Sequence, residues 1–184
     1  GTLVLPSGMQ YRVLALPDHR ILSLAALKKA DALVRGGATV LGPKPLKAVS
    51  LVGGEDGRAE FRDLADQLWG REVAEKAGTR TVGQGRVAWG MGARELLTMD
   101  GLAPDVEFRG NDPHSDLRWI HYRIGKDDVY YGCNQKPRHE QATAIFRCGS
   151  KVPEFWDPSN GSVRTANTFA FEEGRTSVPM EFGP

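Results

Sequence analysis

Two Gly-x-Gly patterns are the first residues whose spacing could serve a chemical purpose, the binding of a nucleotide phosphate. They occupy residues 83–85 and 90–92. Neither extends to Gly-x-Gly-x-x-Gly, and no Gly-Lys-Ser or Gly-Lys-Thr occurs in the chain. Because glycine also serves tight turns, we interpret the second pattern, which lies between a strand and a helix, as a strand-to-helix turn.

An activated nucleophile is missing where one is expected. In a nucleophile elbow, Ser or Cys follows an apolar strand directly, but here Pro17, Gly42 and Gly90 follow the three candidate strands. Asp18 and His19 stand just after the first strand, where ligands of open α/β sheets bind. They are therefore candidate ligand-binding residues, although a turn stabilised by the Asp18 side chain is the interpretation that we favour.

A sugar-binding platform is the second candidate site. Trp119, His121 and Arg123 share one face of an alternating strand, and Trp156 lies in a later strand. Because aromatic rings stack on sugar faces, Trp119, His121 and Trp156 are candidate ligand-binding residues. A packed sheet face, or an interface with another domain, explains the same residues, and we favour it.

Metal and acid–base chemistry find no support in the sequence. No pair of histidines has the helical spacing of metal ligands, and two cysteines alone do not make a zinc site. The acidic residues gather on a loop, on the polar face of one predicted helix and at strand ends, so none stands out as a glycosidase pair. We expect no metal, no cofactor and no catalytic residue in this chain.

The first half has the strand and helix order of an α/β fold. Apolar runs predict buried strands at residues 11–16, 38–41 and 85–89. Apolar periodicity predicts a helix capped by Ser23 that runs to about residue 34, and further helices at 58–69 and 93–99. Short connections in this order favour parallel strands with right-handed crossovers. We expect an α/β domain at residues 1–104 that lacks its N-terminal part.

The second half changes to short strands separated by turns. Strands are predicted at residues 117–124, 128–133, 141–148, 152–156, 168–171 and 176–182, with a strong turn signal at 157–161. This pattern is typical of an antiparallel sandwich. We expect a β-sandwich-like domain at residues 105–184 that lacks its last strand, because the edge at 176–182 has no predicted partner.

Composition excludes several classes of protein. The 184 residues carry a net charge of +1, which gives no electrostatic case for nucleic acid or an anionic membrane. No apolar run approaches the roughly 18 residues of a membrane span, and no basic and apolar leader is visible. Cys133 and Cys148 flank a predicted hairpin in which Cys133 pairs near Ala142, so two half-buried thiols are favoured over a disulfide.

Several stretches, taken in order, resemble one enzyme family almost end to end. In the first half they are LPSGMQYRVLALP at 5–17, GGATVLGPKP at 36–45, LADQLWG at 64–70 and GQGRV at 83–87. In the second half they are WIHYR at 119–123, DVYY at 128–131, Asn134 with Gln135, EFWDP at 154–158 with Gly161, and GRTSVPM at 174–180. The chain resembles the C-terminal region of large bacterial glycoside hydrolases of family 106, the α-L-rhamnosidases.

This resemblance implies a parent enzyme, periplasmic or secreted, that removes terminal rhamnose from plant or bacterial glycans. Its (β/α)-barrel and catalytic carboxylates would lie upstream, so no catalytic residue is carried over to this chain. The first half would be an amidotransferase-like or flavodoxin-like accessory domain, of the kind also found beside barrels in β-galactosidases. The second half would begin a sandwich, and the chain would be a fragment cut at both ends.

Three functional hypotheses follow from these observations. The leading one is a non-catalytic structural piece that packs on the missing catalytic barrel, with exposed apolar surface around Trp69, Trp89 or Trp119. The second is a stand-alone carbohydrate-binding module. The third is a small α/β nucleotide-binding or amidotransferase-like protein without a nucleophile. We also expect that exposed edge strands allow self-association, because an unpaired edge can pair with a second copy of the chain.

Overall fold

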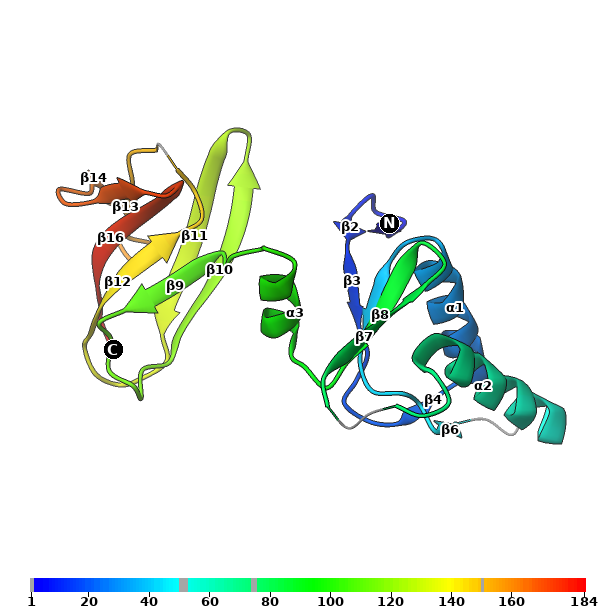
Figure 1. Ribbon diagram of the computed structural model, residues 1–184. Coiled ribbons are helices and arrows are strands. Elements are labelled where there is room, and N and C mark those ends of the chain that lie inside the picture. The colour runs from blue at the N-terminus through cyan, green and yellow to red at the C-terminus, as the bar shows by residue number, and fades with distance from the viewer. Residues whose placement is uncertain (1, 50–52, 74–75, 150) are drawn as a thin grey trace. The chain divides into compact units, whose positions relative to one another are not determined.

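The computed structural model describes residues 2–49, 53–73, 76–149 and 151–184. The backbone forms two compact units, residues 1–101 (unit 1) and 102–184 (unit 2) (Figure 1). In the described residues the chain consists mostly of short strands in several small sheets, with a few helices and no closed barrel. The predicted order, α/β elements first and strands alone afterwards, is confirmed at this level.

Unit 1 is built around a small sheet with the strand order β3-β5-β8-β7. The strands of this unit are β1 (Leu3–Val4), β2 (Gln10–Tyr11), β3 (Val13–Ala15), β4 (Ile21–Leu22), β5 (Thr39–Leu41), β6 (Lys47–Ala48), β7 (Gly78–Val82) and β8 (Gly85–Trp89). The predicted parallel pairing of β3, β5 and β8 is confirmed. Strand β7 was not predicted and pairs antiparallel to β8 across a two-residue turn. That turn begins at Gly83, whose φ is 62°, so the first Gly-x-Gly pattern is a hairpin turn.

The helices of unit 1 are α1 (Leu24–Arg35), α2 (Gly54–Trp69) and α3 (Ala93–Met99). Ser23 caps α1 as predicted, because its hydroxyl accepts a hydrogen bond of 3.1 Å from the backbone N–H of Ala26. Gly37 follows this helix with φ of 102°, in the left-handed region. Helix α2 begins four residues earlier than predicted. Gly92 is the N-cap of α3, so the second Gly-x-Gly pattern is a strand-to-helix turn, as predicted.

The sheet of unit 1 is covered on both faces, and successive strand residues alternate between them. Val40 and Val87 pack with α1 and α2, which lie together on one face of the sheet (Figure 1). Leu41 and Ala88, one residue further along each strand, pack with Leu96 of α3. This explains why the strands are apolar throughout rather than alternating.

Unit 2 contains an antiparallel sheet with the order β15-β16-β12-β9 and two separate strand pairs, β10-β11 and β13-β14. Its strands are β9 (Val106–Arg109), β10 (Leu117–Ile124), β11 (Asp127–Asn134), β12 (Glu140–Phe146), β13 (Glu154–Trp156), β14 (Val163–Thr165), β15 (Ala170–Glu172) and β16 (Arg175–Phe182). The six predicted strands are present within a few residues of their expected bounds. Strands β9 and β14 were not predicted.

The predicted hairpin between the two cysteines is wrong. Strand β11 pairs with β10, so Cys133 stands opposite Arg118 and not near Ala142. Strand β12 pairs instead with β16 and β9, which lie far from it in sequence. The chain between β11 and β12 therefore crosses from one strand pair to another sheet. Both cysteines are free and half-buried, as predicted.

Aromatic side chains fill the space between the four-stranded sheet and the β10-β11 pair. The rings of Phe108 and Phe182 meet edge to face at 6.0 Å. Tyr130 of β11 lies 4.7 Å from the ring of Phe146 of β12 and 6.4 Å from the ring of Trp119. These contacts join the two sets of strands through their facing sides, and such ring pairs stabilise a core beyond their buried area.

Candidate functional site

The residues that the sequence proposed as ligands are divided between the two units. Asp18 and His19 are exposed in the loop between β3 and β4 of unit 1. The Nδ1 atom of His19 accepts a weak hydrogen bond of 3.4 Å from the backbone N–H of Ile21, which suits a turn. Trp119, His121 and Trp156 belong to unit 2. Trp156 is 72% exposed, and its indole N–H donates to Glu154.

His121 lies at the centre of an ion cluster in unit 2. Its Nδ1 lies 2.8 Å from a carboxylate oxygen of Asp105, and its Nε2 lies 3.0 Å from one of Asp128. The ring of Tyr130 stacks on the imidazole at 4.1 Å. Because both ring nitrogens face carboxylates, both contacts are hydrogen bonds when each nitrogen carries a hydrogen. We call this set, with the basic side chains around it, the His121 cluster.

Basic side chains complete the His121 cluster. Lys151 Nζ lies 2.6 Å from the second oxygen of Asp128, and Arg123 Nε approaches the first at 3.3 Å. Arg147 Nη2 donates to Asp105 at 3.1 Å. The Asp128 side chain is only 6% exposed, so its charge is balanced almost entirely by protein groups.

The electrostatics of the His121 cluster follow from these contacts. The hydrogen bond from Lys151 is the main cause that lowers the pKa of Asp128 to about 2, with smaller contributions from His121 and Arg123. Burial, with the nearby charge of Asp105, raises the pKa of Tyr130. Burial also raises the pKa of the Cys148 thiol. The cluster therefore holds an ionised Asp128 and neutral Tyr130 and Cys148 at neutral pH, an arrangement suited to holding strands together.

The contacts of His121 fit the packed-face interpretation of the strand at 117–124. The imidazole is stacked on one face and bound at both nitrogens, so it offers no free polar atom for a sugar hydroxyl. A ligand-binding role for Trp119, which is 38% exposed, stays a prediction. The same holds for Asp18, His19 and Trp156.

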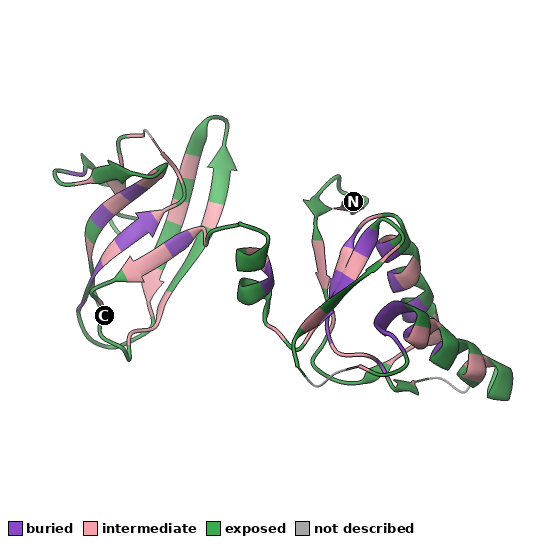
Figure 2. Ribbon diagram, viewed as in Figure 1, coloured by how far each residue is buried: buried purple, intermediate pink, exposed green. Residues whose placement is uncertain are grey.

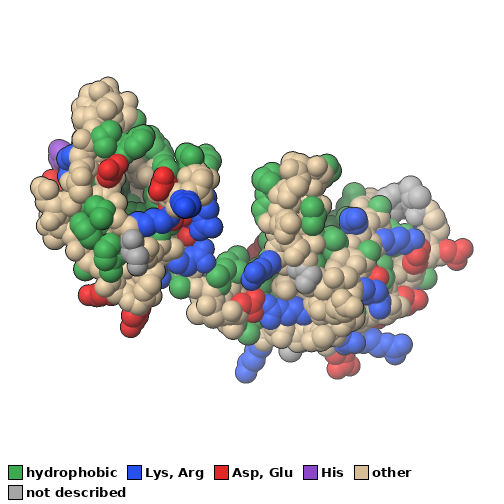
Figure 3. Space-filling view, turned by 90° about the horizontal axis from the view of Figure 1, so that it is seen from above, with side chains coloured by type: hydrophobic (Ala, Val, Ile, Leu, Met, Phe, Trp, Pro, Cys, Tyr) green, Lys and Arg blue, Asp and Glu red, His purple; other side chains and the backbone are tan. Residues whose placement is uncertain are grey.

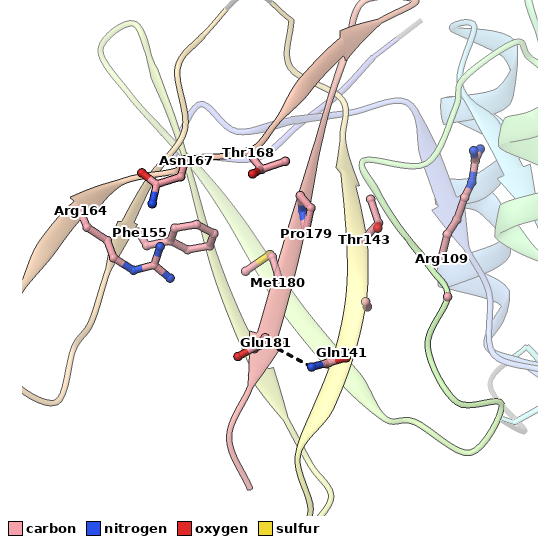
Figure 4. A pocket seen from close by; sticks show the side chains of 12 residues that line it. Arg109, Gln141, Thr143, Phe155, Arg164, Asn167, Thr168, Pro179, Met180 and Glu181 are labelled. Carbon is pink, nitrogen blue, oxygen red and sulfur yellow. Dashed lines mark hydrogen bonds between the residues drawn. The ribbon is translucent and has the colours of Figure 1, made fainter.

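A groove of about 560 Å³ lies on the opposite face of the four-stranded sheet, within the size range of ligand pockets. Its floor crosses three strands, because Arg109 of β9 pairs with Thr143 of β12, which pairs with Pro179 of β16. One wall comes from Phe155 of β13 and Arg164 of β14 (Figure 4). We call this the unit 2 groove.

Polar side chains of the unit 2 groove are mostly open to solvent. Gln141 donates to Glu181 at 3.0 Å across the β12-β16 pair. Arg164 places its guanidinium 4.2 Å above the ring of Phe155. Asn167 and Thr168 follow β14 and line the same wall. Sequence reasoning missed this site, because its residues come from separate strands and only strand pairing brings them together.

Exposed residues are frequent along β10 and β11 (Figure 2), and those that point away from the His121 cluster form an apolar outer face. The side chains on this face alternate with the residues that point toward the His121 cluster, and each is at least 42% exposed. They are Ile120, Tyr122, Ile124, Val129 and Tyr131. We call this the outer apolar face. Contiguous exposed apolar residues of this kind mark interaction surfaces.

The surface charge and the possible metal ligands do not indicate a further site among the described residues. Basic and acidic side chains are interspersed on the surface in view (Figure 3), as the net charge of +1 implies. In the described part of the chain, no three His, Cys, Asp or Glu side chains are placed to hold a metal ion. Among the same residues, no helix is long and apolar enough to cross a bilayer.

Comparison with known proteins identifies relatives of which this chain spans a small part. It is 34% identical to the rhamnosidase from Novosphingobium sp. PP1Y over 99% of its length, with a TM-score of 0.86, but it covers only 17% of that enzyme. It is 28% identical over its full length to a protein named putative β-glucuronidase from Formosa agariphila, of which it covers 14%. A GH42 β-galactosidase from G. stearothermophilus shares the fold over 92% of the chain, at 10% identity and a TM-score of 0.51.

The family model of glycoside hydrolase family 106, described as α-L-rhamnosidase, matches residues 1–170. The match covers both units and nearly every element described above. Together with the likeness to a solved rhamnosidase, it confirms the resemblance that the order of the sequence motifs indicated. The chain therefore belongs to glycoside hydrolase family 106, the α-L-rhamnosidase family.

Proposed function

We propose that this chain is a non-catalytic accessory region of a longer glycoside hydrolase that acts on rhamnose-containing glycans. One observation carries the proposal: the chain matches a stretch that makes up only 17% of a rhamnosidase. The carboxylates of the His121 cluster lend support, because Asp105 and Asp128 are held by His121 and basic side chains. A glycosidase acid and nucleophile must instead face the bond that they cleave.

The accessory units have a finer architecture that we also propose. Unit 1 would be a flavodoxin-like or amidotransferase-like layer, supported by three parallel strands with helices on both faces. No Ser or Cys follows β5 or β8, which argues against amidotransferase chemistry. Unit 2 would be a β-sandwich, supported by the aromatic contacts between its facing strands.

The partner of the accessory region would be the catalytic barrel of the same longer enzyme. The expectation of exposed apolar surface at Trp69 is wrong, because this side chain is buried and its indole N–H donates to Gly42 O at 3.0 Å. Trp119, which the same expectation named, is exposed, and the outer apolar face offers further apolar surface on unit 2. A periplasmic or secreted location of the enzyme rests on the family resemblance alone.

Activity of the chain itself tests the accessory role. The 184-residue protein should release no more nitrophenol from p-nitrophenyl α-L-rhamnoside than buffer does. A matched sample with Asp105→Asn and Asp128→Asn controls for a contaminating hydrolase. Turnover by the natural sequence that is absent from this variant would overturn the proposal, because the chain would then contain the chemistry.

Carbohydrate binding is a second candidate function, and the unit 2 groove favours it. The groove combines carboxamide, hydroxyl and carboxylate side chains, which can bind sugar hydroxyls, with the apolar surfaces of Phe155, Pro179 and Met180. Glycan binding by the isolated chain would separate this function from a purely structural role.

A further inference from the structure

We propose that the unit 2 groove binds an acidic oligosaccharide, one that carries carboxylate groups. This inference rests on the second candidate function, glycan binding, and adds the charge of the ligand. The first support is size, since a groove of about 560 Å³ has room for more than a single sugar residue. Its floor extends across three paired strands, from Arg109 to Pro179, and its wall continues to Arg164.

The charge of the groove is the second support. Two guanidinium groups, of Arg109 and Arg164, lie on opposite sides of β12 and β16 (Figure 4). The Arg109 side chain is 73% exposed and approaches a carboxylate, that of Glu107, only at 4.0 Å. Arg164 makes no ion pair with the residues that the structure describes and rests on Phe155. The one acid of the groove, Glu181, already accepts a hydrogen bond from Gln141. The groove thus has two available cations and a surplus of positive charge.

The chemistry of arginine selects the ligand. A guanidinium presents two parallel N–H donors that can bind the two oxygens of one carboxylate. Stacking on an aromatic ring holds the guanidinium in place. Between the two arginines, side chains of Gln141, Thr143, Asn167 and Thr168 can donate to and accept from sugar hydroxyls. A carboxylated sugar chain would use both sets of groups, whereas a neutral chain would offer no carboxylate to either guanidinium group.

The test is an NMR titration of the 184-residue chain with trigalacturonate and with the same trisaccharide as its methyl ester. The ester keeps the sugar ring and loses the charge. We expect backbone amide shifts at Thr143, Asn167 and Glu181, and binding of the acid about tenfold tighter than of the ester. The preference should shrink as salt is raised, because the arginines are exposed.

Variants assign this preference to the groove. Arg109→Gln and Arg164→Gln should each weaken binding of the acid about threefold, so that together they account for the tenfold preference, and should leave binding of the ester nearly unchanged. Arg62→Gln, on the exposed side of α2 in unit 1, is the matched control and should change neither. Amide spectra of each variant show whether unit 2 keeps its fold, and Arg109→Gln gives a second test if loss of the Arg164 stacking disturbs β13-β14.

Each other outcome contradicts a distinct claim. Equal binding of acid and ester would overturn the charge preference and leave glycan binding standing. Acid binding with shifts outside the groove, or equally weakened by Arg62→Gln, would overturn the assignment of the site. Binding of neither compound would overturn both this inference and glycan binding as a function, while the accessory role would depend on its own activity assay.

Discussion

Replacement of Asp128 by Asn tests how far the His121 cluster stabilises unit 2. Asn keeps the shape of the side chain but removes the charge that Lys151 and His121 share. The fall of the Asp128 pKa from 3.8 to about 2 is nearly two units, which at about 1.4 kcal/mol per unit gives at most ~2.5 kcal/mol. Solvent around Arg123, which is 72% exposed, screens part of this, so we expect about 1–2 kcal/mol from the charge.

The substitution also removes the carboxylate that Lys151 and the Nε2 atom of His121 contact. Loss of one partner from a buried ionic network adds to the cost, so Asp128→Asn should lower the free energy of unfolding of unit 2 by about 2–3 kcal/mol at pH 7. The measurement is urea unfolding followed by the amide signals of Ala144 and Val178, which are buried in unit 2. Asp127→Asn, its exposed neighbour on β11, is the matched control and should change stability by less than 0.5 kcal/mol.

The pH dependence has a definite sign. Because the pKa of Asp128 is lowered in the folded state, its contribution is present above about pH 4 and is lost as pH falls toward 2. The difference in stability between the natural sequence and Asp128→Asn should therefore shrink steadily between pH 5 and pH 2. A difference that is below 0.5 kcal/mol at pH 7, or that stays constant over this range, would refute the reasoning.

Two further substitutions test unit 1. Lys44→Met should lower the free energy of unfolding of unit 1 by about 1–2 kcal/mol, because Lys44 Nζ binds Asp66 and the carbonyl of Gly70, both at 2.6 Å. The measurement is urea unfolding followed at the Val87 amide. Lys47→Met, at an exposed position, is the control, and an equal loss of stability there would contradict this role of Lys44. Gly85→Ala should abolish the dispersed amide spectrum of unit 1, because a Cβ there would lie 2.2 Å from the carbonyl oxygen of Ala38. Gly92→Ala should keep that spectrum, because a Cβ there would meet no atom within 4 Å. A folded Gly85→Ala variant would contradict the prediction, because the backbone of Ala38 would then have moved to make room for the Cβ.

Sequence reasoning located the elements of unit 1 well because their signals are local. The Ser23 cap and the helix that follows depend on residues within one or two turns, and continuous apolar runs marked the buried strands. Strand β7 was not predicted because TRT at residues 79–81 is polar and exposed, as suits a strand at the edge of a sheet. The Gly-x-Gly pattern at residues 83–85 was the available signal, and it was examined only as a possible phosphate-binding loop.

Unit 2 was less predictable because its pairing is not local. The strands were visible from alternation, yet nothing in the sequence near Cys133 shows that β11 returns to β10 while β12 pairs with β16. The His121 cluster was hard to predict for the same reason. Asp105, Asp128 and Lys151 come from separate segments, so His121 was noticed as a candidate while its partners were not. The groove residues, Arg109 and Arg164 among them, carry no pattern that links them.

The His121 cluster also constrains how the β10-β11 hairpin can form. Side chains alternate along a strand, so a slip of one residue between β10 and β11 would turn His121 and Asp128 to opposite faces. Such a mispaired hairpin would either leave the imidazole exposed or place an apolar side chain such as Val129 where Asp128 now meets His121 and Lys151. Because a hairpin forms from local contacts before distant strands arrive, mispairing can occur early in folding. The cluster makes the slipped alignment costly as soon as β9 and β12 pack against it, and thereby selects one alignment from several that the backbone alone would accept.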